Sequence, residues 1–141
     1  MVHGFAKTPR YVLKDGSRIT RPIVSPSSSD AKHTVIFAFS DKPEYDTFLR
    51  ASLDALTPYP LVKGYLRNQL ILDDEWLHLL VLDASGPQQE VLDATTFKDV
   101  LEAFQTDSNS VNVTYQLILD VASKGYRIEK LKNATTEKVV S

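Results

Sequence analysis

The three histidines are the side chains in this sequence best suited to bind a metal ion or to transfer protons near neutral pH. His3, His33 and His78 stand far apart, and the chain has no cysteine. A zinc site generally combines such residues at short, regular spacing. His78 lies inside an apolar run, so we expect a structural core residue, and we expect His33 on the surface at the end of a strand. The sequence predicts no metal ligand, no catalytic residue and no cofactor.

Carboxylates, glycines and serines form no specific motif either. Asp73-Asp74-Glu75 could coordinate a hard cation, but it lacks the glycine and the alternating ligands of a calcium loop, so we interpret it as a solvated turn. The five glycines are too far apart for a phosphate-binding loop, and no serine lies in a Gly-x-Ser-x-Gly motif. Two carboxylates brought together by folding could act as acid and base, yet the sequence cannot pair them. An enzyme is therefore a hypothesis without named residues.

Basic residues concentrate near the N-terminus. Residues 1–40 carry a net charge of +4, residues 41–107 a charge of −8 and residues 108–141 a charge of +2, within a total of −2. Such segregated charges either neutralise one another across the folded surface or bind a charged partner. For the second case, the candidate partner-binding residues are Arg10, Lys14, Arg18 and Arg21.

These four bases are expected on an N-terminal β-hairpin at the edge of a sheet. Strands are predicted at 10–14 and 18–24, joined by a type I′ turn at Asp15-Gly16. Pro22 favours the edge because it cannot donate a backbone hydrogen bond. The polar residues that follow predict a flexible loop over 25–32.

The expected register of this hairpin places Arg10 opposite Arg21. Two like charges in such a pair are destabilising unless an anion lies beside them. That anion is either an acidic residue from 41–107 or a carboxylate or phosphate of a partner, which arginine can bind with two hydrogen bonds.

The middle of the chain predicts a central strand followed by a helix. Residues 34–39 are apolar at both odd and even positions, which is typical of a strand buried on both faces. Asp41 and Glu44 form a capping box, and apolar residues then follow at helical spacing, so a helix is predicted over 42–56.

Three further elements are predicted beyond this helix. Two apolar runs, 68–73 and 76–83, are interpreted as strands inside the sheet. Thr96, followed three residues later by Asp99, favours the start of a short helix.

Residues 110–123 fit two patterns, because their apolar side chains alternate as in a strand and also match helical spacing. We expect a helix, since Lys124-Gly125 resembles a glycine that ends a helix before a final strand over 126–131.

Together these elements predict an α+β fold: a predominantly antiparallel sheet of about five to six strands with two to three helices packed on it. The length of 141 residues suits a single domain, which we place at 1–132, with a frayed or disordered tail at 133–141. The residues expected in the core are Phe37, Phe39, Phe48, Leu49, Leu70, Leu72, Leu79, Val81, Leu101 and Phe104.

Composition restricts the function only broadly. Without cysteine, and without an apolar run long enough for a signal peptide or a membrane span, we expect a cytoplasmic protein with no membrane partner. The main hypothesis is a non-enzymatic protein-interaction module or assembly subunit, of the adaptor, inhibitor, immunity or viral accessory type. The alternative is nucleic-acid binding by the basic hairpin, although the pI near 5.9 weighs against it.

A homodimer is also predicted. Few helices are expected to cover the two doubly apolar strands, so a second copy could bury the remaining sheet face. The biological role, the identity of the partner and the oligomeric state do not follow from the sequence.

Overall fold

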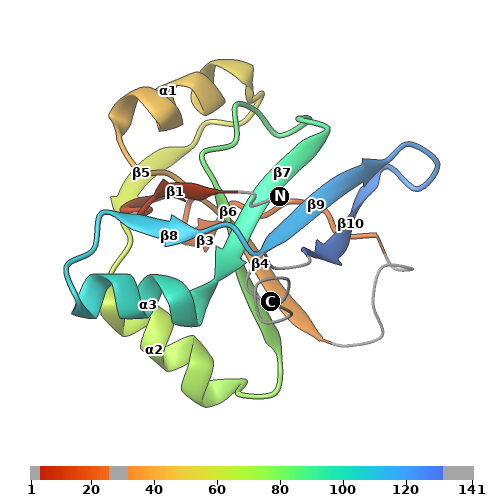
Figure 1. Ribbon diagram of the computed structural model, residues 1–141. Helices are drawn as coiled ribbons and strands as arrows, with labels where there is room; N and C mark the ends of the chain where they lie inside the picture. Colours follow the sequence, from red (N-terminus) through yellow and green to blue (C-terminus); the bar gives the residue numbers. More distant parts are fainter. Residues whose placement is uncertain (1–3, 26–31, 132–141) are drawn as a thin grey trace.

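A computed structural model describes residues 4–25 and 32–131. Within these residues it contains three helices and ten strands arranged in three sheets (Figure 1). The helices are α1 (Lys42–Ala51), α2 (Lys63–Leu72) and α3 (Phe97–Gln105). The strands are β1 (Phe5–Lys7), β2 (Tyr11–Asp15), β3 (Arg18–Ile19), β4 (His33–Ala38), β5 (Thr57–Pro60), β6 (Leu77–Leu82), β7 (Val91–Thr96), β8 (Ser110–Asn112), β9 (Tyr115–Asp120) and β10 (Gly125–Lys130).

The largest sheet has five strands in the order β10-β9-β7-β6-β4. Its pairs are antiparallel except β4 with β6, which are parallel. Parallel neighbours need a long crossover, and here α1, β5 and α2 provide it. The fold is α+β as expected, but among the described residues it has ten strands in three sheets instead of one sheet of about five to six strands, and the largest sheet is mixed because β4 and β6 are parallel.

The N-terminal hairpin belongs to a second sheet, of order β3-β2-β5, and its turn differs from the prediction. The turn residues are Gly16 and Ser17, because Asp15 pairs with Arg18. Gly16 has φ of +65°, which suits the first position of a type II′ turn, where glycine is preferred. This shifts the register by two residues, so that Arg10 does not lie opposite Arg21, and the expected pair of like charges does not form.

The predicted second strand of the hairpin is also shorter than 18–24. After Ile19 the chain passes from β2 to β4: the Thr20 N–H still donates to the Leu13 carbonyl of β2, whereas the Thr20 carbonyl accepts from the Phe37 N–H of β4. Tyr11 forms an isolated antiparallel bridge with Phe39, just after β4, on the side of β2 that faces β3. The hairpin therefore covers the edge of β4, which is the outer strand of the five-stranded sheet rather than a central strand.

On its other side, β2 pairs with β5, whose four residues are all exposed. The Leu61 N–H donates to the Arg10 carbonyl, while the N–H and carbonyl of Tyr11 are bonded to Phe39. Because hydrogen-bonded pairs alternate along antiparallel strands, the nitrogens of Pro58 and Pro60 face away from β2, toward the open edge.

Alternate residues of β4 and β6 enter two cores on opposite faces of the sheet. On one face, Phe37 and Val81 pack with Phe48 of α1. On the other face, Ile36 and Leu80 pack with residues of α2 and α3. Figure 1 shows α1 on one side of the strands and α2 and α3 together on the other. Both strands are buried on both faces, as predicted, and helices of the same chain contribute to covering each face.

Not all the predicted core residues are equally buried. Phe37, Phe39, Phe48, Leu79 and Val81 are almost completely inaccessible. Leu49, Leu70, Leu101 and Phe104 are partly buried. The prediction for Leu72 was wrong, because it ends α2 with 72% of its surface exposed.

Three predicted elements are corrected by the structure. The run 68–73 is the second half of α2 rather than a strand; Leu66 and Leu70 bury one face of this helix. The helix predicted over 42–56 ends at Ala51. The predicted helix over 110–123 consists of the short strand β8 and of β9, which pairs with β7 and β10.

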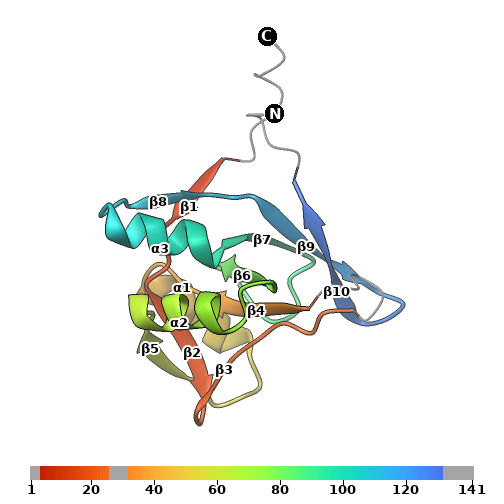
Figure 2. The same ribbon diagram turned by 90° about the horizontal axis from the view of Figure 1, so that it is seen from below.

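The other elements agree with the prediction or were not anticipated. The short helix begins as expected, because the Thr96 side chain accepts a hydrogen bond from the Asp99 N–H. The last strand is present as β10, and Figure 2 shows the β9–β10 hairpin at the opposite end of the molecule from α3. β1, β5 and β7 had no counterpart in the prediction. Most of the expected loop 25–32 and all of the expected tail 133–141 lie outside the described residues.

Candidate functional site

Arg10 is held where three elements meet, at the start of β2. Its backbone N–H donates to the Phe39 carbonyl and its own carbonyl accepts from Leu61. Its guanidinium donates to Oδ1 of Asn109 over 3.4 Å. These bonds fix the position of one of the four predicted partner-binding residues.

Beside Arg10 is a pocket of about 260 Å³, which we call the Arg10 pocket. In the part of the chain that the structure describes, its cations are Arg10 and Lys63, and its only acidic lining residue is Asp107. The rest of the lining is apolar and consists of Leu61, Val62, Ala103 and Phe104. The pocket therefore combines two cationic groups with an apolar wall.

Lys63 is the first residue of α2, and this helix start has no anionic group of its own. Val62 precedes the helix and provides no side-chain hydrogen bond to it, and the first turn contains no acidic residue. The N–H groups at the start of a helix lack intrahelical partners, and the helix dipole favours negative charge there. This backbone contribution adds to the charge of Lys63.

Of the other three predicted residues, Lys14 lies on the same face of β2 as Arg10, four residues further along, and Arg18 lies on the opposite face. Lys14 lies above the Tyr59 ring, with its Nζ 4.4 Å from the ring centroid. Arg21 approaches Tyr65: burial raises the pKa of the Tyr65 hydroxyl, and the positive charge of Arg21 opposes this rise. Arg18 alternates with Ile19, whose side chain packs in the core beneath α2, so Arg18 points to the opposite face.

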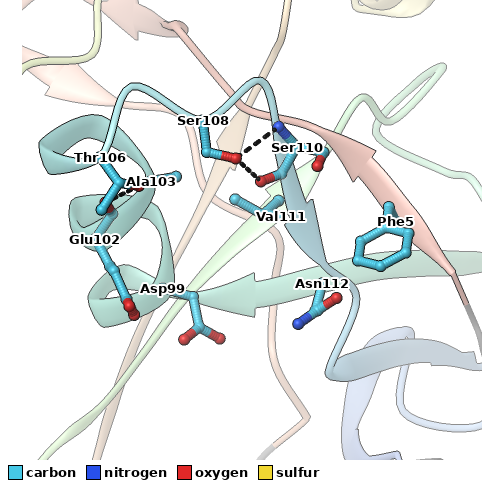
Figure 3. A pocket seen from close by; sticks show the side chains of 9 residues that line it. All are labelled: Phe5, Asp99, Glu102, Ala103, Thr106, Ser108, Ser110, Val111 and Asn112. Atoms are coloured by element: carbon cyan, nitrogen blue, oxygen red, sulfur yellow. Dashed lines mark hydrogen bonds between the residues drawn. The ribbon is translucent and has the colours of Figure 1, made fainter.

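A second pocket, of about 290 Å³, has the opposite charge; we call it the acidic pocket (Figure 3). Among the described residues, its lining contains Asp99 and Glu102 of α3 and no basic residue. Figure 3 shows both carboxylates projecting on the same side as the Asn112 amide, with Phe5 beyond. Phe5 is 72% exposed, which is unusual for a large apolar side chain. The residues lining the acidic pocket are Phe5, Asp99, Glu102, Ala103, Thr106, Ser108, Ser110, Val111 and Asn112.

The acidic pocket was not predicted, because the wall between Asp99 and Asn112 depends on the strand β8, where we expected a helix, and the pairing of β1 with β8 adds Phe5. Phe5 is opposite Asn112 in this pair, more than one hundred residues away in sequence. Asp99 accepts a hydrogen bond from the Thr95 hydroxyl over 3.3 Å, whereas the Glu102 side chain extends into solvent. The only local signal was the spacing of Asp99 and Glu102, three residues apart on one helix face.

Ser40 and Asp83 form a polar pair at the carboxyl ends of the parallel strands β4 and β6. Asp83 accepts hydrogen bonds from the Ser40 N–H at 2.7 Å and from the Ser40 hydroxyl at 2.8 Å. Burial raises the pKa of Asp83 and Glu44 adds to the rise, while the Ser40 bonds and Lys7 lower it. Its φ of +50° lies in the left-handed region, which aspartate adopts more readily than most residues with a side chain. The pair connects the ends of two core strands.

The histidine predicted to be structural is buried in the core. The Nε2 atom of His78 donates to the Asp73 carbonyl over 2.8 Å, and its ring lies 5.2 Å from that of Phe97. Asp73 follows α2, so the bond connects this helix to β6. His33 is half-buried at the start of β4.

Two further observations concern the described residues together. In residues 4–25 and 32–131, no group of three or more His, Cys, Asp or Glu side chains could hold a metal ion. No helix in the same residues has the length and apolar character needed to cross a membrane. The chain matches no protein-family model, no curated protein and no solved structure.

Proposed function

We propose that this protein is a non-enzymatic interaction module or assembly subunit that binds an acidic segment of a protein partner in the Arg10 pocket. The supporting observation is the pairing of two cations, Arg10 and Lys63, with an apolar wall in one pocket of about 260 Å³. Neither cation has an ion pair within the described part of the chain. Asp107 is the single acidic group in the lining, so the pocket favours an anionic ligand.

The chemistry of the pocket suits a peptide. A guanidinium binds a carboxylate with two parallel hydrogen bonds, and an ammonium group adds a less directional attraction. Leu61 and Phe104 offer apolar surface to a neighbouring side chain of the ligand. A segment with one apolar side chain flanked by glutamate or aspartate would use both kinds of contact.

Nucleic-acid binding is the alternative, and the arrangement of the bases favours it less. A nucleic-acid surface needs several cations along one face to contact successive phosphates. Arg18 points away from the face that carries Arg10 and Lys14, and Lys14 contacts the ring of Tyr59, so the four bases do not form one row. The third hypothesis, an enzyme using two carboxylates, stays a prediction without support from a specific geometry.

Fluorescence anisotropy with labelled probes tests the proposal. The probes are a short peptide with glutamates around one leucine, the same peptide with glutamine in place of glutamate, and a single-stranded DNA oligonucleotide. We expect binding of the glutamate peptide only. Arg10→Gln and Lys63→Gln should each weaken it by about tenfold, which corresponds to about 1.4 kcal/mol for one charge-assisted contact.

Arg18→Gln is the matched control, because it removes an exposed positive charge on the opposite face of the hairpin. It should leave peptide binding unchanged. Equal binding of the glutamate and glutamine peptides would contradict the proposal. Tight binding of DNA that Arg18→Gln weakens as much as Arg10→Gln would favour the nucleic-acid alternative.

A further inference from the structure

The two oppositely charged pockets border the same helix. Ala103 lines both of them. Glu102, one residue before Ala103, belongs to the acidic pocket, and Phe104, one residue after it, belongs to the Arg10 pocket. The second half of α3 therefore separates a positively charged recess from a negatively charged one.

Neighbouring patches of opposite charge can be self-complementary. In a dimer with two-fold symmetry, the positive patch of each copy contacts the negative patch of the other, so each contact occurs twice. An axis passing close to the second half of α3 would bring the cations of one copy to the carboxylates of the other. The reciprocal contact would then form by symmetry.

We propose that the acidic segment bound by the Arg10 pocket is the α3 surface carrying Glu102 in a second copy of this chain. This inference rests on the proposed function and names its partner. Lys63 and Glu102 are both exposed, and neither forms an ion pair within the described residues. Their charges are thus available to a second molecule.

Two exposed apolar side chains at the pockets support a protein as the partner. Val62 in the Arg10 pocket is 51% exposed, and Phe5 in the acidic pocket is 72% exposed. Protein interfaces combine apolar contacts of this kind with charged groups that select the partner and its orientation. In each of the two symmetry-related contacts, one copy would contribute Val62 and the other copy would contribute Phe5.

Charge reversal and light scattering test the dimer. The wild-type protein should have about twice the chain mass of 15.8 kDa at low salt. It should shift toward the monomer near 1 M salt, where the Debye length is about 3 Å. Lys63→Glu alone and Glu102→Lys alone should each give the monomer mass, because each variant places like charges against each other twice.

The mixture of the two variants is the decisive measurement. The carboxylate introduced by Lys63→Glu in one chain then meets the ammonium group introduced by Glu102→Lys in the other, and the native Glu102 of the first chain meets the native Lys63 of the second. The mixed sample should therefore recover the dimer mass. Arg18→Glu is the matched control, since it reverses a base on the opposite face, and it should stay dimeric.

Other outcomes overturn the inference. A wild-type monomer at every concentration excludes the self-contact, and so does a mixture that stays monomeric while each variant has the thermal unfolding transition of the wild type. If a reversal variant fails to fold, the neutral Lys63→Gln and Glu102→Gln must weaken the dimer instead. If the wild type is a monomer but still binds the glutamate peptide, only the proposal that the partner is a second copy is refuted. If the wild type neither dimerises nor binds the peptide, the proposed function is refuted too.

Discussion

Replacing Phe48 with alanine removes the side chain that attaches α1 to the sheet. Phe48 is fully buried, and its ring centroid lies 4.8 Å from that of Phe37 and 5.2 Å from that of Phe39. It is the only buried residue of the helix. Burying an aromatic side chain removes roughly 200 Å² from water, or about 5 kcal/mol at 25 cal/mol/Å². Alanine keeps part of this contribution, so we expect a loss of about 4 kcal/mol, within the usual range of about 3 to 5.

Urea unfolding followed by circular dichroism measures this loss. With an m-value of about 2 kcal/mol/M, the midpoint should fall by about 2 M, and the melting temperature by roughly 12 °C. Leu53→Ala, just beyond the end of the same helix, is the control, because Leu53 is completely exposed and should cost almost nothing. A loss below about 1 kcal/mol for Phe48→Ala would show that α1 does not depend on this contact.

Three further predictions concern single contacts. Because burial raises the pKa of Asp83 above its ordinary 3.8, its contribution to stability is complete below that value and is lost as the pH rises through the folded-state pKa. The free energy of unfolding of the wild type, relative to Asp83→Asn, should therefore fall between pH 3 and pH 7 in urea titrations, and a constant difference would contradict the burial effect. In Gly125→Ala the added Cβ would lie 2.9 Å from the Ser25 backbone nitrogen, so we expect a loss of about 1 to 3 kcal/mol, and unchanged stability would mean that the segment moves away freely. Thr96→Ala removes the hydrogen bond to the Asp99 N–H at 3.0 Å and should cost about 1 kcal/mol in thermal unfolding, while Thr96→Ser should cost much less.

Elements with strong local signals were predictable from the sequence. The doubly apolar runs of β4 and β6 and the capped starts of α1 and α3 depend on residues that are neighbours in the chain. α2 lacked such a signal, because Val62 is not a capping residue and no acidic residue marks the first turn. Its apolar run over 68–73 therefore fitted a strand as well as a helix, and only packing on the second core decides between them.

The interpretation of Gly125 explains the error at 110–123. We expected this glycine to end a helix, which requires a positive φ, but the positive φ belongs to Lys124, at +62°. Gly125 is needed instead because the backbone of Ser25 approaches it closely. A contact between residues one hundred positions apart leaves no local pattern in the sequence. We therefore interpreted Gly125 as the end of a helix and gave too little weight to the alternating side chains of β8 and β9.

The candidate site was predictable only through its charges. Arg10 was identified as a basic residue in need of an anion, but the register that motivated this was wrong by two residues. Lys63 and Phe104 were missed because three separate parts of the chain line the Arg10 pocket, and the acidic pocket was missed because it joins Phe5 to residues 99–112. Pockets of this kind follow from tertiary pairing and not from spacing along the sequence.

The exposed edge of β5 has a consequence for colloidal behaviour. An uncovered strand normally offers a row of N–H and carbonyl groups on which another chain can add a strand, and such additions start aggregates. Here the outward-facing nitrogens are those of Pro58 and Pro60, which have no hydrogen to donate. A foreign strand would find acceptors but no donors at these positions, so the sheet should resist growth at this edge even in crowded solution. Pro58→Val together with Pro60→Val would restore both donors and make this edge a starting point for fibres.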